Sequence, residues 1–209
     1  MSDAMAAINL SAVQKQRKRA VLVLFAVLIV LTLVSQSWGG VEGEWHESVE
    51  AAGLISILAA VIGRAWCSLY IGGRKTAELV ASGPYSVTRN PLYVFSFIGA
   101  FGVGAQSGSV TIGLLFTLAS LAIFHLTVRK EEAWLSAKFG DAYADYCRRT
   151  PRFLPRPALW RDEQELVIRP VFFLTTLRDG LVFLLAVPLF EIIDLAQAEG
   201  WLRVIARLP

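Results

Sequence analysis

Long apolar runs constrain this 209-residue chain more than any other feature of its sequence. They occupy residues 20–38, 49–63, 91–106, 110–128 and 170–193, and the second can continue to residue 73. A helix needs about 20 mostly apolar residues to cross a bilayer. The runs therefore predict an all-α fold, a polytopic membrane helical bundle of about five transmembrane helices that forms one domain over residues 1–209.

The composition agrees with a membrane location. Hydrophobic residues make up 55 % of the chain and charged residues 18 %, whereas soluble domains average about 45–50 % and about 25 %. The net charge of +3 would also suit a nucleic-acid-binding protein. The basic residues lie beside the apolar runs, however, where membrane topology explains them better. We therefore expect membrane lipids around the bundle and no nucleic-acid partner.

Two of the five runs leave alternatives open. The first run follows four basic residues between positions 15 and 19, as the core of a signal peptide also would. No A-x-A cleavage site follows it, so we expect a retained helix. Arg178 and Asp179 interrupt the fifth run, which is either a full span, an interfacial helix, or a shorter span that starts at Gly180.

Lysine and arginine are distributed unequally among the connecting segments. Four lie before the first run, four in residues 64–89 and nine in residues 129–169, but none in residues 39–48 or 107–109. Cytoplasmic loops of membrane proteins carry the excess of these residues. The pattern predicts that the N-terminus and the two basic segments face the cytoplasm, and the short chain favours a bacterial inner membrane.

A cytoplasmic helix is predicted after the fourth run. Between Trp134 and Arg148 apolar and charged residues recur at helical spacing, and Thr150-Pro151 ends the pattern. This spacing is typical of an amphipathic helix. Such a helix either lies on the membrane surface or covers a site beneath it.

The segment SGPYSVTRNPLY, residues 82–93, carries more chemistry than a helix start requires. Pro91 suits the first turn of a helix, and Asn90 is placed to cap it. Arg89 adds a full charge to a helix N-terminus, which attracts a carboxylate or phosphate, while Tyr85 and Tyr93 offer flat ring faces. The alternative is that Arg89 pairs with lipid phosphate and the tyrosines form an interfacial belt.

A second charged cluster lies where the fourth run ends, with Glu131 and Glu132 beside Arg129 and Lys130. Only residues 107–109 separate the third and fourth runs, which predicts an antiparallel helical hairpin. The start of one helix then lies next to the end of the other. We therefore expect the Arg89 turn and the two glutamates to share one pocket.

These motifs resemble the isoprenylcysteine carboxyl methyltransferases and the related phospholipid N-methyltransferases, small multi-pass membrane enzymes that use S-adenosylmethionine. The resemblance rests on GPYSVTRNPLY at residues 83–93, EEAWL at 131–135, FGDAY at 139–143, and Tyr146. It covers roughly residues 64–157. It implies a cofactor-binding core there, preceded by two N-terminal spans (1–63) and followed by a C-terminal helix region (158–209).

The resemblance implies a cofactor pocket that faces the cytoplasm. Together with the two charged clusters it gives eleven candidate cofactor-binding residues: Tyr70, Leu79, Val80, Tyr85, Arg89, Asn90, Pro91, Leu92, Tyr93, Glu131 and Glu132. Tyr70 stands where the eukaryotic enzymes have a glutamine and is the weaker candidate. We expect Glu131 to hold the cofactor's amino group or ribose, and Arg89 to orient its carboxylate or to brace Glu131.

Three positions depart from the family pattern. Asn90 replaces the usual histidine, and because an amide does not titrate near neutral pH, no proton transfer is expected there. Ala77 stands where the eukaryotic enzymes have another histidine. Their substrate-binding arginine falls on Thr127, so Arg129 or Arg64 takes over its role, or the substrate differs.

The resemblance implies methyl transfer to a lipophilic acceptor, either the carboxylate or the amine of a prenylated or lipid-like molecule. Three residues are candidates for the catalytic handling of that acceptor: Arg129, Arg64 and His125. The alternative for His125 is a packed residue on an apolar helix, and for Arg64 a side chain that snorkels to the interface.

Two other readings remain open at this point. An NADPH-dependent membrane reductase of the sterol reductase type also carries an R-x-P-x-Y turn, and a non-catalytic membrane protein could keep the fold as a binding module. Metals are not expected, because His46 and His125 are the only histidines and Cys67 and Cys147 form no CxxC pair. The same spacing gives no support for a disulfide scaffold.

Overall fold

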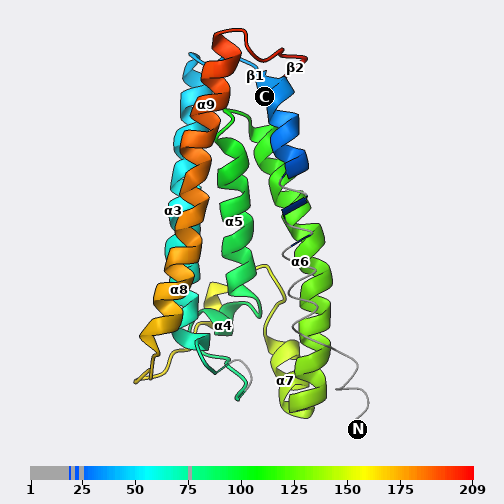
Figure 1. Cartoon of the computed structure of the whole chain (residues 1–209). Helices are drawn as coiled ribbons and strands as arrows, with labels where there is room; N and C mark the ends of the chain where they lie inside the picture. The colour runs from blue at the N-terminus through cyan, green and yellow to red at the C-terminus, as the bar shows by residue number, and fades with distance from the viewer. Residues whose placement is uncertain (1–18, 20–21, 24–25, 75–76) are drawn as a thin grey trace.

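Long helices run side by side along one axis and carry short connections at both ends (Figure 1). The structure is a computed structural model that describes residues 19, 22–23, 26–74 and 77–209, so Lys15, Arg17, Lys18 and part of the first apolar run lie outside the described residues. The helices and strands are β1 (Ser35–Ser37), α3 (Glu44–Ile71), α4 (Pro84–Val87), α5 (Pro91–Ala105), α6 (Val110–Phe139), α7 (Asp141–Arg149), η1 (Pro157–Leu159), α8 (Pro170–Leu181), η2 (Val182–Leu185), α9 (Ala186–Ala198) and β2 (Ala206–Leu208). Residues 26–34 are also helical. The predicted all-α membrane bundle is confirmed.

The hairpin predicted from residues 107–109 is present. Helices α5 and α6 pack against each other, and the side chain of Ser109 caps α6 by accepting a hydrogen bond from the backbone N–H of Ile112 at 3.3 Å. Helix α6 is longer than its apolar run, with 30 residues. Glu131 and Glu132 therefore continue the fourth span without a break, which fixes their direction relative to the membrane helices.

Small residues let α3 and α5 approach closely. A Cβ at Gly102 of α5 would lie 2.6 Å from the carbonyl oxygen of Gly53 on α3, and a Cβ at Gly99 would lie 2.9 Å from the Cβ atom of Ala60. Close backbone approach through small residues is a common way for helices to associate in membranes. The contact sets the position of α5, which begins at Pro91, directly after Arg89 and Asn90.

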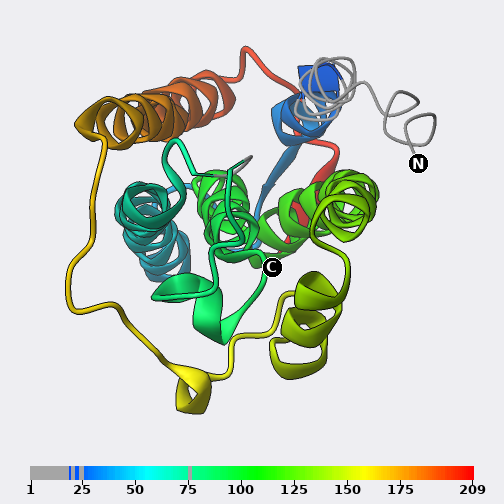
Figure 2. The same ribbon diagram turned by 90° about the horizontal axis from the view of Figure 1, so that it is seen from below.

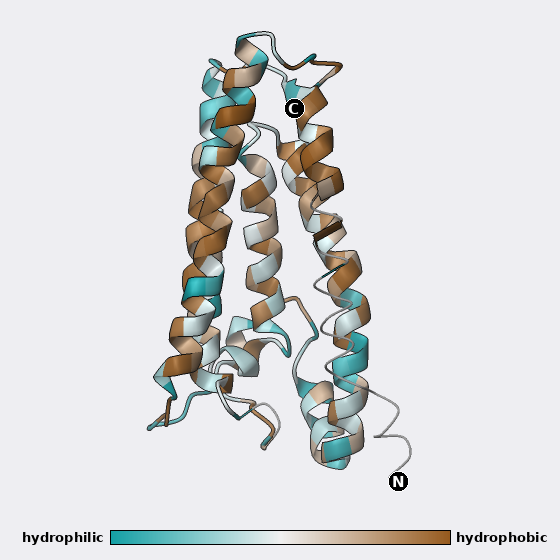
Figure 3. Ribbon diagram, in the orientation of Figure 1, coloured by the Kyte–Doolittle hydropathy of each residue, from teal (hydrophilic) through white to brown (hydrophobic). Residues whose placement is uncertain are grey.

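Three helical stretches are long and apolar enough to cross a membrane within the described residues: Glu44–Ile71, Val110–Phe139 and Pro170–Ala198. Pro91–Ala105 is apolar but shorter. Figure 3 shows the apolar residues concentrated along the middle of the bundle and hydrophilic residues towards its ends. Part of the first predicted span, at residues 20–21 and 24–25, lies outside the described residues.

The fifth run is close to one continuous rod. Helix α8, η2 and helix α9 follow each other without a gap and extend along the whole bundle (Figure 1). The Arg178 and Asp179 side chains, which could have ended the span, are exposed and lie 3.8 Å apart as an ion pair. Length and composition thus favour a spanning helix over a shorter one that starts at Gly180.

The amphipathic helix predicted from Trp134 to Arg148 is two helices, not one. Helix α6 continues to Phe139, and α7 begins at Asp141. Gly140 between them has φ 52°, a left-handed conformation that glycine adopts at little cost. The prediction was wrong at this point because a single glycine inside a helical pattern was not taken as a break. The predicted end at Thr150 is correct.

The first apolar run also ends earlier than predicted. Residues 35–37 leave the helix and pair in parallel with residues 206–208 as the short β1–β2 ladder. The Gln197 amide of α9 donates hydrogen bonds to the carbonyl oxygens of Thr32 and Ser35, both at 3.0 Å. These carbonyls have no partner inside a helix that stops there. The partner of these carbonyls is 165 and 162 positions away from them, so local sequence could not show where the helix ends.

Candidate cofactor and acceptor site

The Arg89 turn consists of the one-turn helix α4 and the extended residues between α4 and α5. Pro91 occupies the first helical position of α5, as predicted. Asn90 occupies the N-cap position, as predicted, but its side chain makes no capping hydrogen bond, so the predicted capping contact was wrong. The Asn90 amide instead donates to the carbonyl oxygen of Arg152 at 3.1 Å. Asn90 therefore ties the turn to a distant segment.

That segment, residues 150–163, is here called the strap. Three main-chain hydrogen bonds join it to the turn and to the residue just before the turn. The Arg89 N–H donates to the Pro151 carbonyl at 2.8 Å, and the Arg156 N–H donates to the Val87 carbonyl at 3.0 Å. The Gly83 N–H donates to the Arg161 carbonyl at 2.7 Å. Figure 2 shows α4, α7 and the strap gathered at the same end of the bundle. The strap therefore holds the turn at its beginning, near Gly83, and at its end, near Arg89.

A cavity lies between this turn and helix α6. It is lined by Ile71, Glu78, Leu79, Val80, Tyr85, Arg89, Asn90, Leu92, Tyr93, Glu131, Leu135 and Tyr146. Eight of the eleven predicted cofactor-binding residues are among them. The predicted meeting of the Arg89 turn with Glu131 is therefore present in the structure.

Two properties of the cavity bear on what it can hold. The Tyr85 hydroxyl is buried and has no hydrogen-bond partner within the described part of the chain, although a buried hydroxyl normally has one. The cavity volume is about 70 Å³, whereas ligand pockets usually measure about 300–1,000 Å³. A cofactor would have to push the lining side chains apart, and one of its polar groups could satisfy Tyr85.

Arg89 and Glu132 belong to a charged network behind the cavity. An Arg89 nitrogen lies 3.4 Å from a Glu132 carboxylate oxygen. Arg152 donates two hydrogen bonds to the same carboxylate, at 3.1 and 2.7 Å. This hydrogen bonding to Glu132 is the main cause of the raised pKa of the Arg152 guanidinium. Arg89 also donates to the Cys147 sulfur. Glu132 is therefore a carboxylate that pairs with both Arg89 and Arg152.

Tyr70 and Pro91 lie beside the cavity without lining it. The Tyr70 hydroxyl donates to the Asp162 carboxylate at 3.1 Å, and its ring packs directly on Gly83. Pro91 is buried in the first turn of α5. Both residues shape the wall from behind, and a direct contact with a cofactor stays a prediction.

The three candidates for handling the acceptor are not grouped around the cavity. His125 and Arg129 are exposed on α6 and do not line the cavity, whereas Glu131 and Leu135 of the same helix do. Arg64 lies between helices, where it donates to the Ser96 hydroxyl and its guanidinium carbon sits 5.9 Å from the centre of the Phe183 ring. Of the three, Arg64 is the one whose side chain is held inside the bundle.

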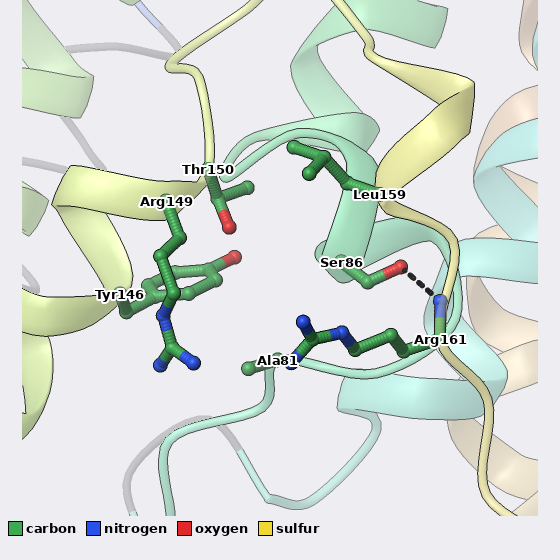
Figure 4. Close-up of a pocket in the computed structure, with 7 residues that line it drawn as sticks. All are labelled: Ala81, Ser86, Tyr146, Arg149, Thr150, Leu159 and Arg161. Atoms are coloured by element: carbon green, nitrogen blue, oxygen red, sulfur yellow. Dashed lines mark hydrogen bonds between the residues drawn. The ribbon is translucent and has the colours of Figure 1, made fainter.

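A second cavity, of about 250 Å³, lies on the other side of Tyr146. It is lined by Ala81, Ser86, Tyr146, Arg149, Thr150, Leu159 and Arg161. In Figure 4 the side chains of Arg149 and Arg161 approach Ala81 from opposite sides, and the Ser86 hydroxyl accepts a hydrogen bond from the Arg161 N–H at 3.0 Å. Two guanidinium groups make this cavity suited to an anionic group.

Three buried tyrosines at this end of the bundle, Tyr85, Tyr143 and Tyr146, have raised pKa values and stay protonated near neutral pH. Burial raises the pKa of Tyr85 well above its usual value, and burial likewise raises the pKa of Tyr143 and Tyr146. The Tyr146 hydroxyl donates to the Tyr85 carbonyl oxygen at 2.6 Å. It therefore fixes the wall that the two cavities share and does not act as a base.

Sequence reasoning missed four lining residues. Leu135 and Tyr146 were part of the motifs but were not assigned to the site, whereas Ile71 and Glu78 had no motif to mark them. Glu78 lies 3.1 Å from Arg74, one turn before it, in an ion pair. The spacing of these two charges was the only signal that could have found Glu78.

Comparison with known proteins supplies a context for this geometry. The family model for phospholipid methyltransferase matches residues 53–142, which include the turn and Glu131. The chain is 36 % identical over 188 residues to the nickel-cobalt-cadmium resistance protein NccN of Alcaligenes xylosoxydans xylosoxydans, covering 90 % of this chain and 86 % of NccN.

Two further relatives differ in how much of their length matches this chain. The cobalt-zinc-cadmium resistance protein CzcN of Cupriavidus metallidurans is 35 % identical over 185 residues, 87 % of this chain and 85 % of CzcN. The protein-S-isoprenylcysteine O-methyltransferase of Schizosaccharomyces pombe is 38 % identical over 81 residues, 39 % of this chain and 34 % of its own. No solved structure matches the chain.

Proposed function

This chain belongs to the phospholipid methyltransferase family of membrane methyltransferases, and we propose that it transfers a methyl group from S-adenosylmethionine to a lipophilic acceptor at the cytoplasmic face of the membrane. The observation that carries the proposal is the cavity between the Arg89 turn and Glu131. It gathers most of the residues that the family resemblance selects, from segments that are about 40 positions apart.

The chemistry of the lining suits this cofactor. S-adenosylmethionine carries an ammonium, a sulfonium and a carboxylate, and the cavity offers the acidic side chains of Glu78 and Glu131 together with the guanidinium of Arg89. The rings of Tyr85 and Tyr93 can pack on the adenine, and aromatic faces also attract a cationic sulfur. The buried Tyr85 hydroxyl provides one hydrogen bond to a polar group of the ligand.

The work of the protein is orientation. When bound, the cofactor supplies a methyl group on an already activated sulfur, so no residue has to activate the donor. Glu131 holds the donor from α6, while the Tyr85–Tyr93 turn, braced by the strap, sets its distance from the acceptor. Holding two reactants in line contributes much of the rate in such reactions, and the buried tyrosines keep water away. Glu132 does not line the cavity; we assign it the role of positioning Arg89, with which it pairs.

The acceptor enters from the lipid. The cavity residues Ile71 of α3 and Glu131 and Leu135 of α6 belong to helices that are long and apolar enough to span the membrane. Arg64 is placed about two turns above Ile71 on α3, close enough to the hydrocarbon region to meet an anionic or carboxylate headgroup. We assign acceptor handling to Arg64 before Arg129 and His125, whose side chains are exposed and do not line the cavity.

Cofactor binding by the Glu131→Gln variant is the direct test. We expect the purified full chain in detergent to bind S-adenosylmethionine in calorimetry, and Glu131→Gln to bind about 10- to 100-fold more weakly, because a charged hydrogen bond contributes about 1.5–3 kcal/mol. The matched control is Glu199→Gln, an exposed glutamate just after α9 at the opposite end of the bundle. It should bind like the unmodified protein.

Two outcomes would sink the proposal. Binding of NADPH without binding of S-adenosylmethionine would identify a reductase, and wild-type affinity in Glu131→Gln would place the donor elsewhere. Transfer of a labelled methyl group to lipid extracts, followed by mass spectrometry, then identifies the acceptor and shows whether oxygen, nitrogen or sulfur is methylated.

The relatives that cover most of the chain are named as resistance proteins for nickel, cobalt, cadmium and zinc. We propose that this chain acts in the same setting, by methylating a membrane component of cells exposed to such metals. A host strain that lacks the protein should grow less well on cobalt salts, and the Glu131→Gln gene should not restore growth. Restoration by Glu131→Gln would separate metal resistance from methyl transfer.

A further inference from the structure

Three metal-ligating side chains meet at the end of the bundle that is opposite to the cofactor cavity. The His46 Nε2 atom lies 3.2 Å from a Glu50 carboxylate oxygen and 3.4 Å from an Asp194 carboxylate oxygen. Their donor atoms all lie within 4.8 Å of one another. His46 and Glu50 come from successive turns of α3, whereas Asp194 comes from α9, so the fold brings the third group to the other two.

The spacing of these atoms is that of a small coordination sphere. Zinc binds histidine nitrogen and carboxylate oxygen at about 2.0–2.2 Å in tetrahedral geometry, which places neighbouring ligand atoms about 3.3–3.5 Å apart. The two distances from His46 Nε2, 3.2 and 3.4 Å, are close to this range. The two carboxylate oxygens lie within 4.8 Å of each other and would move together around an ion. Each side chain is largely buried, with 4 % of His46, 24 % of Glu50 and 16 % of Asp194 exposed.

The imidazole is held in place by packing. A Cβ at Gly108 would lie 2.0 Å from His46 Nδ1, so the ring sits directly on the backbone of the α5–α6 connection. The backbone at Glu50 is fixed as well, because the Gln106 side-chain amide donates to its carbonyl oxygen at 2.9 Å. Rigid ligands lose little freedom when an ion binds.

We propose that His46, Glu50 and Asp194 form a binding site for a divalent transition-metal ion. One imidazole and two carboxylates suit Zn²⁺, Co²⁺ or Ni²⁺, and the absence of a thiolate from this cluster disfavours Cu⁺. With three protein ligands the ion keeps a position for water or another ligand, as in open zinc sites. From the sequence no metal was expected, because the chain has two histidines and no CxxC pair, and Asp194, almost 150 positions away from His46, gave no signal of a shared site.

The site is separate from the proposed methyl-transfer site. His46 and Tyr70 lie on the same helix, and the 24 positions between them correspond to about 36 Å. Figure 1 places the start of α3 and the end of α9 at one end of the bundle and α4 and α7 at the other. The ion therefore cannot contact the methyl donor, and its binding is measurable without activity.

Cobalt titration of the full chain tests the site. In detergent, after treatment with a chelator, we expect one Co²⁺ per chain, with the visible absorption of a four-coordinate ion, and displacement by Zn²⁺. Each of Glu50→Gln, Asp194→Asn and His46→Ala should weaken binding at least about tenfold. Co²⁺ or Zn²⁺ should also raise the unfolding temperature of the unmodified protein, because the ion links α3 to α9.

Matched controls keep the test decisive if His46→Ala fails to fold. Glu47→Gln removes an exposed carboxylate from the same helix, and His125→Ala removes the other histidine; both should bind Co²⁺ as the unmodified protein does. Glu50→Gln and Asp194→Asn preserve shape and serve as the primary variants. Absence of saturable binding, or equal affinity in Glu47→Gln, Glu50→Gln and Asp194→Asn, would overturn the proposal and leave a buried ion-paired histidine.

Discussion

At the scale of single residues, Gly83 has a backbone conformation on which the shape of the Arg89 turn depends. Its φ of 55° and ψ of −131° are open to glycine and strained for other residues. A Cβ there would also lie 2.2 Å from the Tyr70 ring. The glycine of the GPY motif thus allows Tyr70 to pack under the turn and to reach Asp162.

Gly140 provides an unusually close control for Gly83. It has nearly the same dihedral angles, φ 52° and ψ −125°, but a Cβ there would meet nothing within 4 Å. We expect Gly140→Ala to lower the free energy of unfolding by about 1–3 kcal/mol from backbone strain alone. Gly83→Ala should lose more, and should also lose affinity for S-adenosylmethionine.

Thermal unfolding of the two variants in detergent, followed by circular dichroism, makes the comparison. Equal losses would show that the contact between Gly83 and Tyr70 contributes nothing beyond backbone strain. A Gly83→Ala variant with unchanged cofactor affinity would argue that the turn does not shape the pocket.

At the scale of elements, the short helix α7 is important because it buries two phenols, Tyr143 and Tyr146. Burial raises the pKa of Tyr146 above its ordinary value of 10.0. In the unfolded chain this phenol loses its proton near pH 10, while the folded chain retains it. The contribution of this phenol to the free energy of unfolding is therefore fully present below about pH 10, and it decreases as the pH rises further.

Alkaline titration of stability checks this expectation. Between pH 8 and pH 11 the unfolding temperature should stay level and then drop, and the drop should be shallower in Tyr146→Phe, which has one buried phenol fewer. Tyr146→Phe should also cost about 0.5–1.5 kcal/mol at neutral pH from the lost bond to the Tyr85 carbonyl. An identical slope in both proteins would mean that Tyr146 ionises without unfolding.

Local signals explain which elements could be predicted. Pro91 marks the start of α5, residues 107–109 force the hairpin, and together they bring Glu131 to the Arg89 turn. The β1–β2 ladder and the strap contacts could not be predicted, because they join backbone atoms of segments far apart in sequence. The pairing of Arg89 with Glu132 was also missed, since two adjacent glutamates on one helix cannot be told apart without its rotation.

At the scale of the whole molecule, the two ends of the bundle differ in chemistry. One end holds the turn, the strap and the arginines of both cavities, and the other holds His46, Glu50 and Asp194. The distribution of lysine and arginine predicts that the first end faces the cytoplasm. The metal cluster would then face the opposite side of the membrane.

Single cysteines can establish this orientation. In a background without Cys67 and Cys147, Glu42→Cys should react with a membrane-impermeant maleimide in intact cells, because residue 42 is exposed near the start of α3. Glu165→Cys, exposed beyond the strap, should react only after the membrane is opened. The reverse pattern would place the cofactor cavity outside the cytoplasm.

The strap has one more consequence, which concerns evolution. Its contacts with the turn use main-chain atoms at Pro151, Arg156 and Arg161, and Asn90 also reaches a main-chain carbonyl. Main-chain partners are the same whatever side chain a position carries. The strap can therefore exchange most of its side chains during divergence while the turn keeps its shape. Descendants of one ancestral fold could in this way acquire new acceptors without rebuilding the place where the methyl donor binds.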